Sequence, residues 1–132
     1  MADYQPVNGT DTLPFTKTVG ATAVSGGQLV SISGDNLVVP STTGDHSVGV
    51  AAFDAPIGGR VTVWPLSGVV HEIVVQGVLV LAAGNDVIAG TTGTVKAGTL
   101  ATDAAAGTLL GICTKGATGP AKAQFIGTST QA

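Results

Sequence analysis

The chain has 132 residues with eight acidic and five basic side chains, which gives a formal net charge of −3. The Lys and Arg residues are scattered, whereas binding to nucleic-acid phosphates requires them in clusters, and no apolar stretch approaches the roughly 18 residues of a membrane span. These features favour one small domain that binds neither nucleic acid nor a membrane.

The apolar residues are mostly small. Hydrophobic residues make up 44% of the chain, but aromatic residues only 4% and charged residues only 10%. Since burial of a Val side chain contributes only about 1.5 kcal/mol, a lone subunit gains modest stability from such a core. A surface poor in charge also favours partial cover by partners. We therefore expect the chain to bind another subunit or another protein.

The N-terminal residues 1–18 contain no apolar run, which predicts an extended arm ahead of a single β domain over 19–132. Tyr4 and Phe15 are candidate partner contacts that anchor this arm on a neighbouring surface, although a free tail with incidental aromatics has the same composition. The first residues lack the basic start and apolar core of a signal peptide, so we expect synthesis in the cytoplasm without export.

From Val19 onward, short β-branched runs alternate with turns rich in Gly, Asp, Asn and Pro. Turns about every 8 to 12 residues are typical of a sandwich or barrel. The predicted fold class is all-β, a small β-barrel or β-tulip-like domain. The expected strands are Thr22–Val24, Gln28–Ser33, Leu37–Pro40, Ser47–Phe53, Arg60–Trp64, Val69–Val75, Val78–Leu81, Asp86–Ala89, Thr94–Lys96, Thr108–Thr114 and Ala121–Ile126.

The polarity pattern differs between these strands. Alternation with period two in Arg60–Trp64 and Ala121–Phe125 predicts one buried and one exposed face. The apolar runs Ile73–Val75 and Val78–Leu81 lack alternation, which predicts burial on both faces, or burial on one face and a subunit contact on the other. Trp64 lies on the polar side of its strand, where an indole is either a partner contact or a cap on the core.

Two parts of the sequence resemble each other. The segment Val24–Val30 resembles Leu81–Val87, and Val48-Gly-Val50 parallels Leu110-Gly-Ile112, with an offset that drifts from 57 to 62 residues. This drift favours two related β-halves over a solenoid. Chance similarity in a chain rich in Gly, Val and Thr is the alternative.

Few residues are suited to catalysis or metal binding. His71 and Glu72 are neighbours on a strand and point to opposite faces, so they cannot readily share a ligand or a proton. The same geometry weakens the pair Asp45 and His46. Cys113 lies in an apolar strand, where a thiol is usually an inert small hydrophobe. We therefore expect no enzymatic activity, no metal site and no cofactor.

The segments 24–30 and 47–63 in the first half, and 76–87 and 110–113 in the second, together resemble the decoration (cement) proteins of tailed-phage capsids. Gly49-Val50-Ala51 followed by Asp54-Ala55 carries this pattern most clearly, and the resemblance covers about residues 20–127. It implies a β-barrel-like or β-tulip-like fold without catalytic residues. It also implies a homotrimer at three-fold and quasi-three-fold positions on the capsid exterior, bound to the major capsid protein, with N-terminal arms that reach neighbouring coat subunits.

Two alternatives remain open at this stage. The first is another phage structural β module, such as a tail, fibre or carbohydrate-binding domain. The second is a trimeric all-β nucleotide hydrolase of the dUTPase type. Sugar binding relies on exposed aromatic platforms, which are scarce here. Triphosphate chemistry is poorly served by Arg60 as the only arginine.

Overall fold

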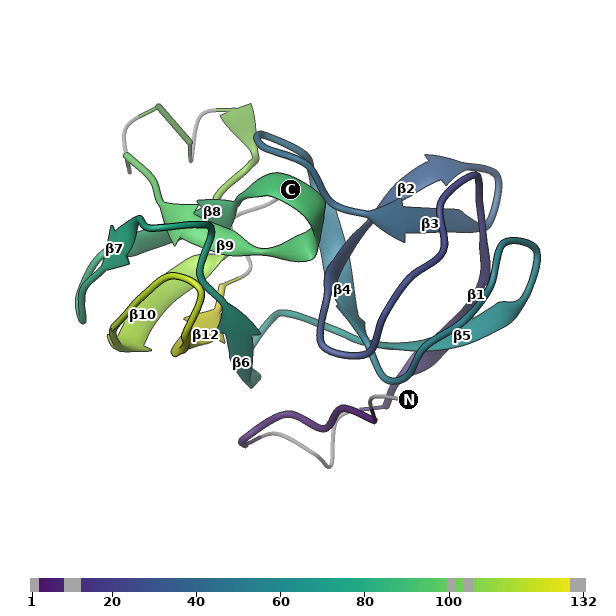
Figure 1. Ribbon diagram of the computed structural model, residues 1–132, viewed down its shortest axis with the longest axis horizontal. Coiled ribbons are helices and arrows are strands. Elements are labelled where there is room, and N and C mark those ends of the chain that lie inside the picture. Colours follow the sequence, from purple (N-terminus) through teal and green to yellow (C-terminus); the bar gives the residue numbers. More distant parts are fainter. Residues whose placement is uncertain (1–2, 9–12, 100–101, 104–105, 129–132) are drawn as a thin grey trace.

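The computed structural model, shown in Figure 1, describes residues 3–8, 13–99, 102–103 and 106–128 and confirms the all-β fold class. A short 3-10 turn at Thr91–Gly93 interrupts the strands. The strands are β1 Phe15–Val19, β2 Leu29–Gly34, β3 Leu37–Pro40, β4 Ser47–Ala51, β5 Arg60–Trp64, β6 Val70–Val74, β7 Val80–Leu81, β8 Asp86–Ala89, β9 Val95–Ala97, β10 Gly111–Lys115, β11 Ala117–Thr118 and β12 Lys122–Gly127.

The first half of the chain forms a closed barrel with the strand order β1-β3-β2-β4-β5. Neighbouring strands are antiparallel except β1 and β3, which run parallel and close the barrel. Since side chains alternate between the two faces of a strand, one set points inward. Small aliphatic side chains fill the interior: Val19, Val24, Val30, Val38, Ala51, Ala55, Val61 and Val63.

Strand β1 corrects the expected N-terminal boundary. It begins at Phe15, inside the segment 1–18 whose composition predicts an arm. It pairs with β5 along most of its length and with β3 at its end, so the barrel cannot close without it. Phe, Thr and Val favour strands, but the segment Phe15–Val19 has no apolar run. Its place in the barrel depends on pairing with its two neighbours.

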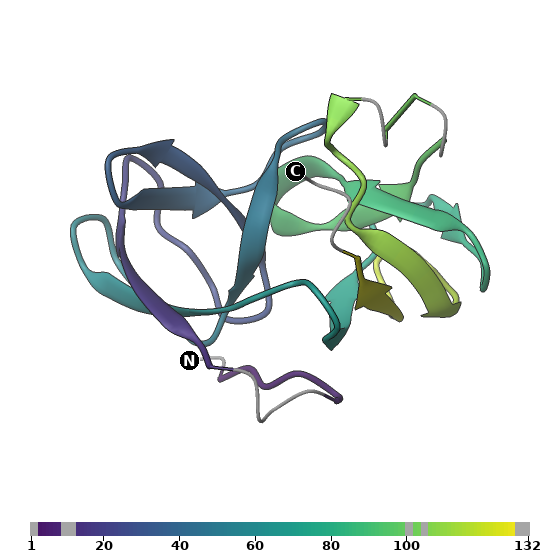
Figure 2. The same cartoon turned by 180° about the vertical axis from the view of Figure 1, so that it is seen from behind.

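The second half forms a five-stranded sheet with the order β6-β12-β10-β8-β9. A parallel bridge between Val75 and Val95 brings the ends of β6 and β9 together, and β7 and β11 form a small separate pair. Figures 1 and 2 show the two halves as rolled sheets side by side, with the N-terminal segment beneath them.

The two halves share one topology. Strands β1 to β5 correspond to β6, β8, β9, β10 and β12, and each pair of neighbours in one half has a counterpart of the same direction in the other. The register agrees as well, because Leu29 pairs with Val50 in the first half and Asp86 with Ile112 in the second. The repeat in the sequence therefore reflects two copies of one fold, as the reading of two related β-halves predicted.

Two equivalent glycines mark the same close approach in both copies. A Cβ atom on Gly49 in β4 would collide with the carbonyl oxygen of Trp64, and one on Gly111 in β10 would collide with the carbonyl oxygen of Ile126. Trp64 and Ile126 are themselves equivalent positions of β5 and β12. The strands cross too closely at this point for any side chain, which explains why Gly recurs there.

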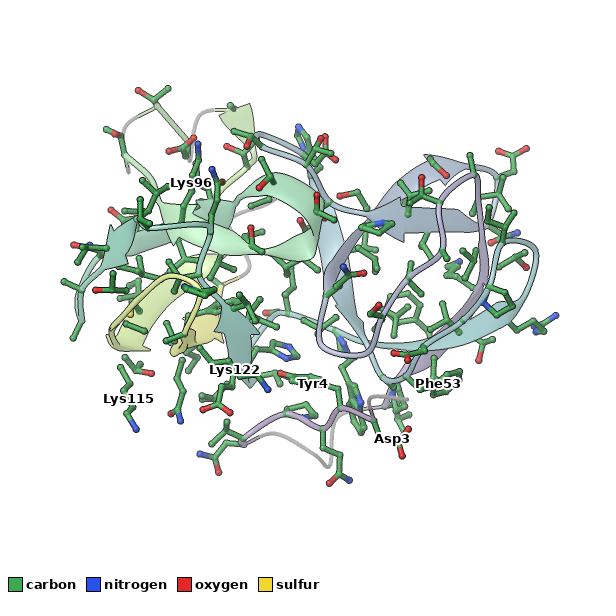
Figure 3. The ribbon with its side chains drawn as sticks, in the orientation of Figure 1. Asp3, Tyr4, Phe53, Lys96, Lys115 and Lys122 are labelled. Carbon is green, nitrogen blue, oxygen red and sulfur yellow. The ribbon has the colours of Figure 1, made fainter. Side chains whose placement is uncertain are left out.

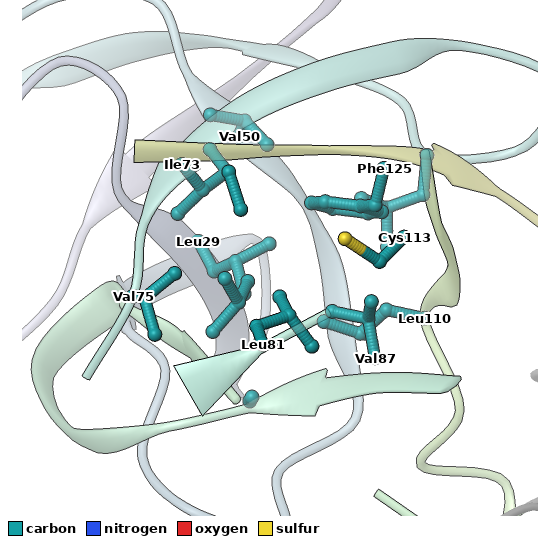
Figure 4. Packing of buried hydrophobic residues seen from close by; sticks show 13 residues of the cluster. Leu29, Val50, Ile73, Val75, Leu81, Val87, Leu110, Cys113 and Phe125 are labelled. Atoms are coloured by element: carbon teal, nitrogen blue, oxygen red, sulfur yellow. The ribbon is translucent and has the colours of Figure 1, made fainter. Parts of the chain in front are cut away.

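The halves are joined through a shared core, because β2 and β4 carry apolar residues on both faces. Val30 and Ala51 point into the first barrel, whereas Leu29 and Val50 belong to the hydrophobic cluster of the second half. Figure 4 shows Leu29 and Val50 among side chains of that half, including Ile73. Each fully buried aliphatic side chain contributes roughly 1.5–3 kcal/mol, so this contact stabilises the two halves together.

The close approach gives a test of the duplication. We expect Gly49→Ala and Gly111→Ala each to lower the free energy of unfolding by about 2–3 kcal/mol, because the added methyl group meets a backbone carbonyl that cannot move aside. Gly34→Ala is the matched control, since its methyl group would meet only the flexible end of Leu37. Urea denaturation measures all three, and a loss confined to one copy would contradict the equivalence.

Candidate interaction surface

The described part of the N-terminal segment, residues 3–8, lies across both halves of its own chain (Figure 3). The backbone N–H of Tyr4 donates to the carbonyl oxygen of Ala52 in the first half at 2.6 Å. The N–H of Val7 donates to the carbonyl oxygen of Val70 in the second half at 2.8 Å, and Asn8 forms a bridge with the same residue. This segment therefore clasps the two halves together.

The Tyr4 side chain anchors the clasp through a partly buried chain of hydrogen bonds. The ring of Tyr4 stacks on the imidazole of His71, which has no exposed surface. The hydroxyl group donates to Nδ1 of His71 at 2.7 Å and accepts the backbone N–H of Glu72 at 3.1 Å. Nε2 of His71 lies 2.8 Å from the carbonyl oxygen of Pro65, which can only accept, so Nε2 carries the proton of the neutral ring.

Burial shifts both titratable groups of this chain toward their neutral forms. Desolvation lowers the pKa of His71 to about 4, against a smaller opposing effect of the Pro65 carbonyl. Desolvation also raises the pKa of the Tyr4 phenol, and the nearby Glu72 carboxylate adds to this rise. Both groups are therefore uncharged at neutral pH, as the hydrogen-bond chain requires.

The structure places the three predicted partner contacts within the chain's own packing. Trp64 is half-buried, and its indole N–H donates to the carbonyl oxygen of Tyr4 at 3.2 Å, so these two predicted residues lie together. Phe15 packs against the core of the first barrel, with Nζ of Lys17 at 5.8 Å from its ring centroid. Their role as contacts to another protein remains a prediction.

A groove of about 310 Å³ lies beside the clasp at the junction of the halves. Its lining includes Tyr4 and Asp3 from the clasp, Gln28 from the first half, and Glu72 and Lys122 from the second half. Glu72 accepts a hydrogen bond from the amide of Gln124 at 3.2 Å. The groove therefore presents polar groups of both charges from the clasp and from both halves.

The structure shows where the residues considered for catalysis or metal binding lie. His71 is buried and Glu72 is partly exposed, as opposite faces of a strand require. Cys113 is buried, and desolvation raises the pKa of its thiol. Within the described ranges, no three His, Cys, Asp or Glu side chains are grouped to hold a metal ion. No helix among the described residues is long and apolar enough to span a membrane.

Several large aliphatic side chains are exposed in the second half. Val78, Leu79 and Val80 lie at or before β7 with exposed surfaces, which corrects the expectation of burial on both faces and leaves the alternative of a subunit contact. Ile112 and Ile126 are also exposed, on the outer face of the second sheet. Neither residue was identified from the sequence, although their place in the alternation of β10 and β12 marks them as outward-pointing.

Comparison with known proteins finds a solved structure of similar fold. No protein-family model matches the chain, and no curated protein matches it in sequence. Its structure is similar to the crystal structure of the head fiber gp8.5 N base of bacteriophage phi29, with a TM-score of 0.68 and 17% sequence identity. The match covers 88% of this chain and 93% of that chain, so it includes both β-halves.

The clasp predicts a measurable effect of one hydroxyl group. Tyr4→Phe keeps the stacked ring but leaves Nδ1 of His71 and the N–H of Glu72 without their partner, so we expect a loss of about 1–3 kcal/mol in unfolding free energy. Thr114→Val is the control, because it removes an exposed hydroxyl group and should change stability by less than about 0.5 kcal/mol. Equal effects of both variants in thermal denaturation would contradict a buried anchor.

His71 also makes stability depend on pH. Because its pKa is about 4 in the folded chain and 6.5 as a free side chain, the unfolded chain binds this proton more readily. The contribution of the neutral His71 imidazole to the free energy of unfolding is present in full above pH 6.5. It is lost as the pH decreases toward 4, by up to about 3 kcal/mol. NMR titration of the imidazole should give a midpoint near 4; a midpoint at the ordinary value would mean that the ring is solvated.

Proposed function

We propose that this chain is a structural protein of a tailed-phage head, bound as a homotrimer to the outer surface of the assembled shell, which it stabilises. The observation that carries the proposal is the similarity to the head fiber base of bacteriophage phi29 across both halves of the chain. The resemblance of the sequence to capsid decoration proteins points to the same surface. On this proposal the partner is the major capsid protein, and the protein is part of the virion.

The physical properties of the chain support this role. A ligand that binds the assembled shell but not free coat subunits stabilises the shell by mass action. Three linked contacts in a trimer add avidity, so each contact can be weak and poor in charge. We also propose that the chain has no enzymatic activity, no metal and no cofactor; its His71 and Cys113 are buried in the core.

A second structural role is favoured by the identity of the neighbour. Because that neighbour is the base of a head fiber, this chain can be a base from which a fibre projects, and not a separate cement subunit. Both roles place it on a phage head. They differ in whether further fibre material is attached to the bound protein, which negative-stain images of the particles distinguish.

Co-sedimentation tests the proposal. Purified protein mixed with empty, expanded heads of the phage that encodes it should pellet with them up to a fixed stoichiometry, and heads carrying it should disrupt at a higher temperature. Unassembled coat protein is the control and should bind much less. A protein that stays in the supernatant at micromolar concentration would contradict the proposal, and so would turnover of a nucleoside triphosphate that a point substitution abolishes.

A further inference from the structure

The hydrogen bonds that tie the clasp to the second half can run in only one direction. The carbonyl oxygen of Pro65 only accepts, so Nε2 of His71 donates to it and Nδ1 accepts the hydroxyl proton of Tyr4. The Tyr4 hydroxyl oxygen in turn accepts the backbone N–H of Glu72, which only donates. This order requires a neutral imidazole that carries its proton on Nε2.

A proton added to His71 breaks this order. Both ring nitrogens then donate, so Nδ1 and the Tyr4 hydroxyl group face each other as two donors across 2.7 Å. If the hydroxyl oxygen instead accepts from Nδ1 as well as from the N–H of Glu72, its own proton has no acceptor among these groups. A donor that is shielded from water and left without a partner costs free energy. The contact between the clasp and the second half is therefore weakened in either case.

Comparison of the two halves shows that the fold does not need a histidine at this position. His71 pairs with Phe125 on β12, and the equivalent residue on β1 is Phe15, which pairs with Val63 on β5. Phe15 is partly exposed, whereas His71 lies beneath Tyr4 and has no exposed surface. The titratable ring thus lies under the clasp, at a position that an apolar ring fills in the other half.

The surroundings of His71 do not favour a charge on its ring. The groups in contact with the ring are uncharged at neutral pH: the Tyr4 phenol, the Pro65 carbonyl and the Phe125 ring. The ionisable side chains of the same elements line the groove and are Asp3 on the clasp, Glu72 on β6 and Lys122 on β12. Glu72 and Lys122 project from the opposite face of the sheet, because side chains alternate along each strand and His71 pairs with Phe125.

We infer that the clasp is acid-sensitive: protonation of His71 releases residues 3–8 from the rest of the chain while the two β-halves stay folded. Release exposes Trp64 and frees the backbone groups of Ala52 and Val70 that the clasp occupies. The shared core around Leu29 and Val50 holds the halves together without it. This inference concerns the chain alone and does not rest on the proposed function.

Amide hydrogen exchange of the full chain, followed for each residue by NMR, tests the inference. The reporters are backbone N–H groups bonded across the clasp, those of Tyr4, Val7, Val70 and Glu72. The pKa of His71 is about 4 in the closed chain and 6.5 for the solvated ring. The protection factors of these amides should therefore fall about a hundredfold between about pH 7 and about pH 4, or to the level of unstructured chain.

Two amides away from the clasp serve as internal controls. The N–H of Val75 donates to the carbonyl oxygen of Ala121, and that of Ala51 donates to the carbonyl oxygen of Gln28. Both acceptors stay in place when the clasp opens. At the lower pH, the protection factors of these two amides should remain higher than those of the reporters, because local opening leaves the halves intact.

His71→Asn separates the titration from the packing. The oxygen of the shorter amide side chain can accept the Tyr4 proton but does not take up a proton itself. Protection of the reporter amides should then be independent of pH over the same range. His71→Phe, which copies the ring found at Phe15, should also abolish the pH dependence. Glu72→Gln is the matched control, since it removes the neighbouring carboxylate and should keep the fall seen in the wild-type chain.

Far-UV circular dichroism verifies that each variant is folded. The inference is overturned if the reporter amides of the wild-type chain keep their protection in acid, or if Val75 and Ala51 lose theirs to the same level. It is also overturned if both His71 variants show the wild-type fall. A fall that disappears in Glu72→Gln would assign the effect to the carboxylate and contradict the role of the imidazole.

Discussion

The burial of Leu29 and Val50 in the core of the second half is the contact on which the rest of the structure depends. These residues lie on the outside of a barrel that already has its own interior, filled by Val30, Ala51 and their neighbours. Because the second half takes them into its hydrophobic cluster, the two copies of the fold are held in one fixed arrangement. That arrangement brings Ala52 and Val70 into line for the clasp and leaves Ile112 and Ile126 partly exposed on the outer face of β10 and β12.

The clasp shows how a sequence poor in aromatics can hold two small cores together. Tyr4 contacts both halves, since its backbone is bonded to Ala52 and its hydroxyl group to His71. A buried polar chain is stable only when each member has a partner, and here each does. The same contacts position Trp64 through its indole N–H. These residues therefore have a structural role within the chain, and their role as contacts to another protein stays a prediction.

Local patterns in the sequence predicted much of the fold. Alternation identified the half-exposed strand Arg60–Trp64, and the similarity of the segments around Gly49 and Gly111 revealed the duplication. What local patterns could not show depends on tertiary contacts. β1 lies in a segment without an apolar run and is held by pairing with β3 and β5, and Val78–Val80 is apolar but exposed. Alternation marks Ile112 as outward-pointing, but only tertiary contacts decide whether an outward side chain is covered, as the equivalent Val50 is.

Electron cryo-microscopy of tailed-phage heads that carry this chain tests the proposed function most directly. We expect density outside the shell, at three-fold and quasi-three-fold positions, into which three subunits of this fold fit. Shells that carry the protein but show no such density on their outer surface, or density that only a different fold can fill, would contradict it.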